Sequence, residues 1–319
     1  MQIGHIKLDA PVIFAPMAGI SDLVNRRIVR AMGAGLTYSE MVSAKALVHG
    51  NAATKLLLRT DDADRPCSLQ IFGSDPEAMG TAAKLLEDTA FEIIDINSGC
   101  PARKIVQNGD GSALMKNPEL TRKIIQSVKA NTSKPVTIKI RLGWDWDSIN
   151  CIEIAKIAED CGVSAITVHG RTRSMMFGGE ADWSLIKAVK NAVSVPVIGN
   201  GDVCDPIQTK RLMVESGVDA VMIGRASYGN PWVFKRIAAF LTKGELLPEP
   251  NVQEKIDMAL EHARLQIEYN GEKVALREIR KHIAWYIKGI KNATEAKVRV
   301  NNSESFDEVR AILEELSCG

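Results

Sequence analysis

The feature that most constrains the fold is a unit repeated through roughly the first 240 residues. Each unit has a short apolar, β-rich run, a polar turn and an amphipathic helical stretch such as Pro118–Asn131 or Asp205–Ser216. Most runs are continuously apolar, which is typical of parallel strands covered on both faces. The eight runs are Val12–Met17, Leu36–Met41, Cys67–Gly73, Glu92–Gly99, Pro135–Arg141, Ala165–Gly170, Pro196–Gly201 and Ala220–Arg225.

Eight such units in about 230 residues predict an α/β fold of the (β/α)8 TIM-barrel type. A doubly wound open sheet is the rival fold. It is disfavoured because no GxGxxG turn follows the first run, where Ala15-Pro16-Met17-Ala18-Gly19 stands instead.

The chain changes character after the last βα unit. The segment Gly244–Asn251 holds two prolines, a glycine and two acids, a composition typical of a linker. Strand patterns stop beyond it, and helices are predicted at Val252–Asn270, Glu272–Lys291 and Phe306–Leu316. We therefore expect a barrel domain at residues 1–243, a linker at 244–251 and a C-terminal all-α domain at 252–319.

Composition excludes several classes of protein. The formal net charge of the 319 residues is only +1, so any surface that binds nucleic acid has to be local. No run of about 18 apolar residues predicts a membrane span, and polar sequence follows Met1 where a signal segment would stand. The six cysteines lack metal-ligand spacing, so we expect no metal, reduced thiols and a cytoplasmic location.

Chemistry in a TIM barrel gathers where the strands end, so polar residues at those positions are informative. The first run ends in small apolar residues, Pro16–Gly19, which suit a flat ring lying across the barrel mouth. We expect the third strand to end near Gln70 and the fourth at Asn97, although either residue alone is more often a strand-end cap. Lys139 lies inside an apolar strand, where an unpaired ammonium is costly, so we expect it to face an anionic partner or a site.

The seventh and eighth runs predict a phosphate site. They end in Asn200-Gly201-Asp202 and Gly224-Arg225, and the corresponding loops of TIM barrels often bind phosphate through backbone N–H groups. The two glycines allow close approach of the backbone, and Arg225 can add a charge-assisted hydrogen bond. FMN fits this pattern better than a dinucleotide because no second phosphate loop is evident.

Cys100 differs from the other cysteines in its position. It follows the fourth run directly and opens a long polar loop at 102–112. A thiol with a pKa near 8.5 is mostly protonated at neutral pH, so an unactivated cysteine can act as a proton donor. The sequence therefore makes Cys100 the candidate general acid.

With these residues in view, the chain resembles the bacterial tRNA-dihydrouridine synthases, and most closely their B-type branch. Nine motifs carry the resemblance, in order along the barrel, and it continues through Asn230-Pro-Trp-Val-Phe234. The motifs are Ala15-Pro16-Met17-Ala18-Gly19, Ser39-Glu40-Met41, Gln70-Ile-Phe-Gly73, Asp95-Ile-Asn-Ser-Gly-Cys-Pro101, Gly109-Asp-Gly-Ser-Ala-Leu114, Lys139-Ile-Arg-Leu-Gly-Trp144, His169-Gly-Arg-Thr172, Asn200-Gly-Asp202 and Ile223-Gly-Arg225.

The resemblance implies reduction of the C5=C6 bond of specific uridines in tRNA. FMN hydroquinone would deliver hydride to C6, Cys100 would protonate C5, and NADPH or NADH would reduce the flavin again. Asn97 and Arg171 are assigned to the substrate, and no obligate protein partner is expected. The residues assigned to the cofactor are Pro16, Met17, Ala18, Gln70, Lys139, His169, Asn200, Gly201, Asp202, Gly224 and Arg225.

The helical tail carries a candidate RNA surface. On a helical wheel of Glu272–Lys291 the basic residues fall within one arc of about 100°, beside a separate apolar arc. A charge run is usually a solvated helix face, but the acids nearby are too few to balance this one, which favours tRNA phosphate contacts. The basic arc holds Lys273, Arg277, Arg280, Lys281, Lys288 and Lys291, of which Arg277, Lys281 and Lys288 are the assigned substrate contacts.

Two other functions stay open at this point. One is an FMN-dependent reductase or dehydrogenase of a free pyrimidine-like molecule. This alternative gives the basic residues of the helical tail no function. The other is a non-catalytic RNA-binding flavoprotein, against which the presence of Cys100 and Lys139 argues.

Overall fold

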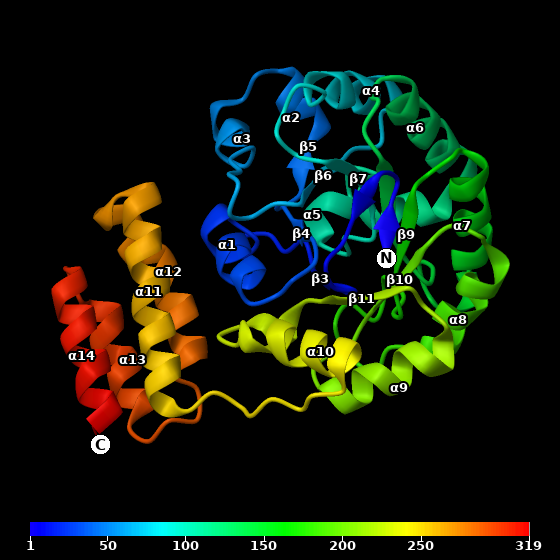
Figure 1. The fold of residues 1–319 in the computed structure, drawn as a ribbon. Coiled ribbons are helices and arrows are strands. Elements are labelled where there is room, and N and C mark those ends of the chain that lie inside the picture. The colour runs from blue at the N-terminus through cyan, green and yellow to red at the C-terminus, as the bar shows by residue number, and fades with distance from the viewer. Residues whose placement is uncertain (319) are drawn as a thin grey trace.

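The computed structural model describes residues 1–318 and contains a barrel with a helical domain beside it (Figure 1). The parallel sheet runs in the order β3-β11-β10-β9-β8-β7-β6-β4. An isolated parallel bridge between Ile13 and Leu36 joins its first and last strands, with the Phe14 N–H donating to the Leu36 carbonyl at 3.0 Å. This arrangement confirms the predicted TIM barrel. The strands are β3 (Val12–Phe14), β4 (Thr37–Tyr38), β6 (Cys67–Phe72), β7 (Ile93–Ser98), β8 (Val136–Arg141), β9 (Ala165–His169), β10 (Val197–Asn200) and β11 (Ala220–Ile223), and a short β5 (Val42–Ser43) also pairs with β6.

Helices cover the outside of the barrel, and their starts follow capping rules. Asp22, Asn117 and Asp205 each accept a backbone N–H at a helix start, and prolines occupy the first turn of α6 and α9. These helices are α1 (Leu23–Ala31), α4 (Pro76–Leu85), α6 (Pro118–Ala130), α7 (Cys151–Asp160), α8 (Trp183–Ala192), α9 (Pro206–Ser216) and α10 (Trp232–Lys243). Shorter segments are α2 (Ala44–Val48), α3 (Ala52–Leu56), α5 (Arg103–Val106) and the 3-10 turns η1 (Gly111–Lys116), η2 (Trp146–Ser148) and η3 (Arg225–Ser227).

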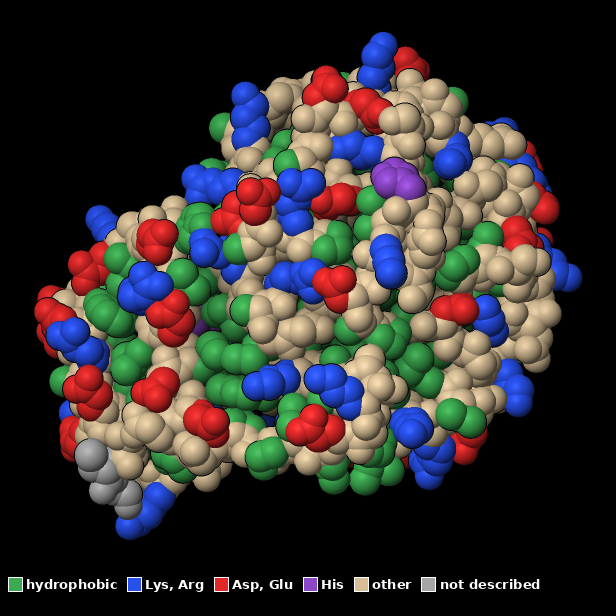
Figure 2. All heavy atoms as spheres, in the orientation of Figure 1, with side chains coloured by type: hydrophobic (Ala, Val, Ile, Leu, Met, Phe, Trp, Pro, Cys, Tyr) green, Lys and Arg blue, Asp and Glu red, His purple; other side chains and the backbone are tan. Residues whose placement is uncertain are grey.

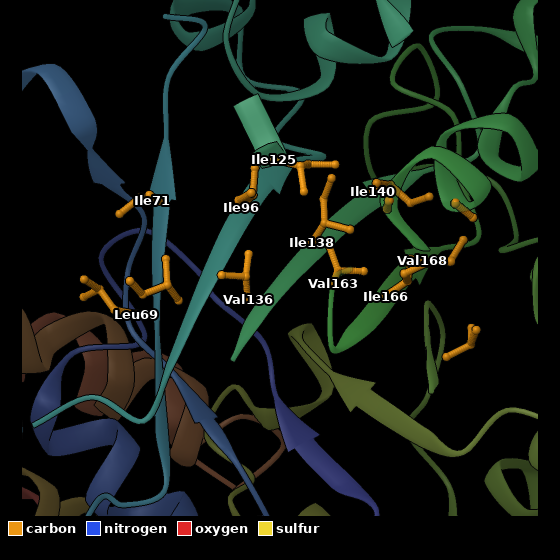
Figure 3. Packing of buried hydrophobic residues seen from close by; sticks show 14 of the residues in the cluster. Leu69, Ile71, Ile96, Ile125, Val136, Ile138, Ile140, Val163, Ile166 and Val168 are labelled. Atoms are coloured by element: carbon orange, nitrogen blue, oxygen red, sulfur yellow. The ribbon is translucent and has the colours of Figure 1, made fainter. Parts of the chain in front are cut away.

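Alternation along the strands separates the core from the site. Ile94, Ile96 and Ile138 belong to the large apolar cluster between strands and helices, which Figure 3 shows with Ile125 of α6. Successive side chains of a strand point to opposite faces, so the polar residues between these isoleucines face the barrel interior. On β7 and β8 they are Asp95, Asn97, Thr137 and Lys139.

The N-terminal hairpin lies at the other end of the barrel. Strands β1 (Gln2–Ile3) and β2 (Ile6–Lys7) pair antiparallel. Ile3 and Leu8 are buried in one cluster with Ile13, Ile198 and other residues of the barrel strands. The hairpin therefore covers the N-terminal end of the barrel.

The C-terminal helices form a domain with its own apolar cluster, drawn in orange and red in Figure 1. They are α11 (Val252–Asn270), α12 (Glu272–Tyr286), α13 (Ala293–Asn302) and α14 (Phe306–Cys318). Helix α11 contacts α1, where Gln266 donates to the Asp22 carboxylate at 2.6 Å. On the other side, Tyr228 stacks on Trp285 of α12 with ring centroids 4.4 Å apart. None of the helices within residues 1–318 combines the length and the apolar character that a membrane span requires.

The C-terminal end of the predicted helix Glu272–Lys291 is wrong. Helix α12 stops at Tyr286, and tight turns follow in which Lys288 and Ile290 donate to carbonyls three residues back. Gly289 adopts a left-handed φ of 85°, a conformation that favours glycine and ends helices. As a result Lys288 and Lys291 lie beyond the helix that carries Arg277. Helix α13 was not predicted, and α14 extends to Cys318, two residues past the expected end.

Candidate active site at the mouth of the barrel

A cavity of about 710 Å³ lies where the barrel strands end. It brings together every candidate site residue that the sequence placed in the barrel, from all parts of the first 230 residues. The assigned residues that line it are Pro16, Met17, Ala18, Gln70, Asn97, Cys100, Lys139, His169, Arg171, Asn200, Gly201, Asp202, Gly224 and Arg225. Further lining residues that the sequence did not assign include Met41, Arg141, Met176, Phe177 and Tyr228.

The apolar side of the cavity is the loop after β3. The Met17 N–H donates to the Ser21 hydroxyl at 2.9 Å, and the Gly19 N–H donates to the Glu40 carboxylate. Across the cavity edge, a side chain at Gly224 would meet the Met17 sulfur at 3.6 Å. The loop is thus held at both ends while Pro16 and Met17 present apolar surface.

A chain of side-chain amides crosses the cavity floor. The Gln70 amide donates to the Asp95 carboxylate at 2.7 Å, and the Asn97 amide donates to Gln70 Oε1 at 2.7 Å. Asn97 Oδ1 in turn accepts the backbone N–H groups of Gly99 and Cys100 at 3.1 and 2.9 Å. Burial raises the pKa of Asp95 to about 6, although the hydrogen bonds from Thr137 and Gln70 and the Lys139 charge oppose the shift.

Lys139 is a partly buried cation with a neutral partner. Its Nζ donates to Asn200 Oδ1 at 2.9 Å, and the Asn200 amide donates to the Met222 carbonyl at 2.8 Å. Burial, with the Arg141 charge as the next contribution, lowers the pKa of Lys139 to about 7. A negatively charged group in the cavity would reverse this shift.

The thiol of Cys100 is held on a firmly anchored loop. Besides the bond to Asn97, its carbonyl accepts from the N–H and hydroxyl of Ser112 at 3.0 and 2.9 Å. Gly111 has a φ of 59°, and a side chain there would meet the Cys100 carbonyl at 2.9 Å, so this close turn requires glycine. Burial raises the pKa of Cys100, and the thiol is therefore protonated at neutral pH.

Buried Arg171 forms an ion pair with Asp202, which is 33% exposed, at the phosphate side of the cavity. One guanidinium nitrogen of Arg171 donates to both Asp202 oxygens at 2.7 and 2.8 Å, and Arg171 also bonds the carbonyls of Gly178 and Gly179. Burial opposes ionisation of Asp202, but the hydrogen bonds from Arg171 and Ala181 outweigh it and lower the pKa. These bonds give Arg171 a role in holding its loop, and its contact with substrate stays a prediction.

Arg225 is the more available cation on this side. It is 51% exposed, donates to the Phe177 carbonyl at 3.0 Å and lies 3.7 Å from Asp202. Gly201 and Gly224 lie on the two neighbouring loops, β10–α9 and β11–α10, and both line the cavity. A guanidinium beside two glycine-containing loops, which let the backbone approach a ligand closely, is a suitable surface for a phosphate.

Arg141 is a structural residue of the site to which the sequence assigned no role. Its guanidinium is buried and donates to the carbonyls of Gly99, Thr172 and Met176, each at 2.8 Å. It therefore ties the Cys100 loop to the loop after β9. The sequence could have indicated a role for Arg141, because this charged residue lies in the same apolar strand as Lys139. His169 lies close by, and burial together with these cations lowers its pKa well below the ordinary value, so it is neutral.

The assigned basic residues of the helical domain lie outside the cavity. Arg277 and Lys288 are exposed, whereas Lys281 donates to Glu278 at 2.7 Å and reaches the edge of the mouth near Gly19. Arg280 turns inward to the Ser303 carbonyl, so it does not belong to an exposed stripe. Figure 2 shows acidic and basic side chains intermixed on the face that carries the N-terminal hairpin.

The barrel and the cavity at its C-terminal mouth define a TIM-barrel enzyme with buried ionisable groups around one site. Within that class, the chain belongs to the dihydrouridine synthase family, a family of oxidoreductases, because residues 13–318 match that family.

Several known proteins are similar to this chain. A protein of Rickettsia conorii named "Probable tRNA-dihydrouridine synthase" is 42% identical over 303 residues, covering 94% of this chain and 91% of that protein. The "tRNA-dihydrouridine synthase B" of Pasteurella multocida is 44% identical over 290 residues, covering 91% and 87%. Among solved structures, a complex of 2-naphthoyl-CoA reductase has a TM-score of 0.61 at 13% identity, covering 74% of this chain and 51% of that one, and shares the fold.

Proposed function

We propose that this protein is a tRNA-dihydrouridine synthase that reduces uridine in tRNA with FMN, using NADPH or NADH as the source of electrons. Family membership and the names of the relatives support this reaction. The observation that carries the proposal is the common cavity, in which a protonated thiol, Cys100, lies with the partly buried cation Lys139 and the exposed cation Arg225.

The residues of the cavity fit FMN. Within residues 1–318 the partly buried ammonium of Lys139 donates to the neutral Asn200 oxygen and to no anion, so an electron-rich ring edge would satisfy it. Arg225 and the backbone around Gly201 and Gly224 would hold the phosphate, while Pro16–Ala18 would pack on one ring face. When bound, the flavin supplies the hydride that uracil accepts at C6.

The protein's own groups then complete the reduction. Charge develops toward C5 and O4 of the base, and the Cys100 thiol donates its proton to C5. Arg141 and Asn97 keep the Cys100 loop in place through their bonds to Gly99 and the backbone. Neutral His169 can form hydrogen bonds without adding charge, and Lys139 supplies an electrostatic counterpart to the electron-rich ring.

The reaction is tested by incubating tRNA that lacks dihydrouridine with the protein, FMN and NADPH, and analysing the nucleosides by mass spectrometry. The expected product is a uridine heavier by two hydrogens. Reduction of free uracil with no product in tRNA would instead assign the chain to the small-molecule reductases. Binding of tRNA and FMN without either product would identify a non-catalytic flavoprotein.

The role of Cys100 is tested by Cys100→Ala. We expect the variant to retain FMN and tRNA binding while its turnover falls by about 10²–10⁴-fold, the usual contribution of a positioned acid. Cys161→Ala is the matched control, because Cys161 is half-buried at the end of α7 and away from the cavity lining. Unchanged steady-state turnover in Cys100→Ala would exclude the acid role.

A further inference from the structure

Asp95 lies one layer below the cavity and ends the amide chain on its floor. The carboxylate is fully buried and does not line the cavity itself. One oxygen accepts from Gln70 at 2.7 Å, and the other accepts from the Thr137 hydroxyl at 2.6 Å. We call the sequence of bonds from the Cys100 backbone through Asn97 and Gln70 to Asp95 the amide relay.

Both ends of the amide relay have a fixed polarity. The backbone N–H groups of Gly99 and Cys100 can only donate, and the Asp95 carboxylate can only accept. Asn97 must therefore turn its oxygen to the backbone and its nitrogen to Gln70. Gln70 must turn its oxygen to Asn97 and its nitrogen to Asp95, so only one orientation of each amide satisfies every bond.

We propose that Asp95 is a positioning residue that fixes the orientation of the Gln70 amide, and thereby which of its edges donates and which accepts toward the ring of the bound cofactor. This inference rests on the proposed function, because Gln70 is the relay member assigned to the flavin ring. Gln70 lines the cavity and Asp95 does not, so Asp95 acts on the ligand through Gln70.

Reversing the relay tests the proposal. In Asn97→Asp a second carboxylate faces the Gln70 oxygen, so one contact is repulsive whichever way Gln70 turns. In the double variant Asp95→Asn/Asn97→Asp, Gln70 can donate to position 97 and accept from position 95, so both of its bonds in the amide relay are restored in the opposite direction. Thr137 can still donate to the new amide oxygen at position 95, and the new carboxylate at position 97 can still accept the two backbone N–H groups.

The two readouts are thermal unfolding and titration of FMN into the flavin-stripped full-length chain. We expect Asn97→Asp to lower the Tm and the double variant to recover it. The FMN Kd of the double variant should nevertheless stay about tenfold above wild type, the effect of one misdirected hydrogen bond. Recovery of both properties would overturn the proposal, and so would failure of the double variant to recover the Tm.

A charge placed at position 97 could also weaken FMN binding directly, and Gln70→Met separates the two causes. In the wild-type background this change should weaken FMN binding about tenfold, because a correctly oriented amide is lost. In the double variant it should have no effect, because the reversed amide contributes nothing. Equal losses in both backgrounds would overturn the proposal.

If the wild-type chain bound no FMN, the proposed function and the contact of Gln70 with the flavin ring would fail together. Recovery of the Tm in the double variant would still support the orientation of the Gln70 amide by Asp95.

Discussion

The ionisable residues of the cavity are tuned by burial, and Lys139 gives the clearest consequence. Its pKa is about 7 without a ligand, and a ring-edge oxygen or nitrogen of FMN that accepts its hydrogen bond would raise that value. Between the two pKa values the complex binds a proton that the free protein lacks. FMN affinity should therefore rise as the pH falls from about 9 to about 7, a window in which the phosphate stays mostly ionised.

Calorimetry in two buffers with different heats of ionisation measures this proton uptake directly. At pH 8 we expect uptake of a fraction of one proton per FMN bound. Lys139→Met is the control, because it removes the titrating group and should abolish both the uptake and the pH dependence. An FMN affinity in wild type that is constant between pH 7 and 9 would contradict the assigned role of Lys139.

At this scale the sequence indicated which residues meet but not how they are held. Strand ends of a parallel barrel converge on one mouth, so Cys100, Lys139 and Arg225 could be placed together from their positions in the chain. The hydrogen bonds of Arg141 and Arg171 go to loop carbonyls at residues 99 and 172–179. Those partners depend on the path of long loops, which no periodicity encodes.

Among the secondary-structure elements, regular ones were predictable and their junctions were not. The eight strands follow from continuous apolar runs, and α11 has the predicted bounds Val252–Asn270 because Asn251 caps it and Gly271 ends it. Helix α12 ends early because the chain turns at Gly289, although the apolar periodicity continues to Ile290. Ile287 remains buried in the helical-domain core beyond the end of the helix, so the apolar periodicity gave no sign of that boundary.

The close contact between the β11–α10 loop and α12 predicts that adding one methyl group at Gly229 will strongly destabilise the protein. Gly229, in the loop between β11 and α10, has a φ of 62°, and a side chain there would meet the Trp285 carbonyl carbon of α12 at 2.4 Å. Gly229→Ala should therefore displace the helical domain from the barrel and destabilise the protein by about 2 kcal/mol or more. Urea unfolding and limited proteolysis at residues 244–251 measure the two effects.

Gly244→Ala is the matched control for this change. Gly244 has a similar φ of 71°, but nothing lies within 4 Å of the position that its side chain would occupy. It should show only the backbone cost of about 1–2 kcal/mol for an alanine in the left-handed region. Equal destabilisation by the two variants, with no new proteolysis in Gly229→Ala, would show that close contact with α12 is not needed for docking.

On the scale of the whole molecule, the helical domain stands beside the barrel mouth. Gln266 and Tyr269 of α11 bond to residues near α1, and Lys281 of α12 reaches the loop that carries Gly19. An RNA whose reacting base enters the cavity would therefore extend across α12. A protein with a net charge of +1 can attract such a polyanion only through local groups of this kind.

The structure narrows the set of basic residues that we expect to bind the RNA. Arg277 and Lys288 are exposed and form no ion pair within residues 1–318, whereas Lys281 is paired with Glu278. Replacing Arg277 and Lys288 with glutamine should weaken tRNA binding and reduce the slope of log K against log salt by about 1.5–2, as expected for two lost phosphate contacts. Fluorescence anisotropy with labelled tRNA over a range of salt concentrations measures this slope.

The matched control removes the same charge elsewhere on the same domain. Arg264 and Arg310 are 56% and 50% exposed on α11 and α14, and each is paired within its own helix. Arg264→Gln/Arg310→Gln should leave the slope close to wild type if phosphate contacts are confined to the α12 side. A similar loss of slope in both double variants would mean that net charge, and not the placement of Arg277 and Lys288, governs tRNA binding, because only a diffuse field is indifferent to position.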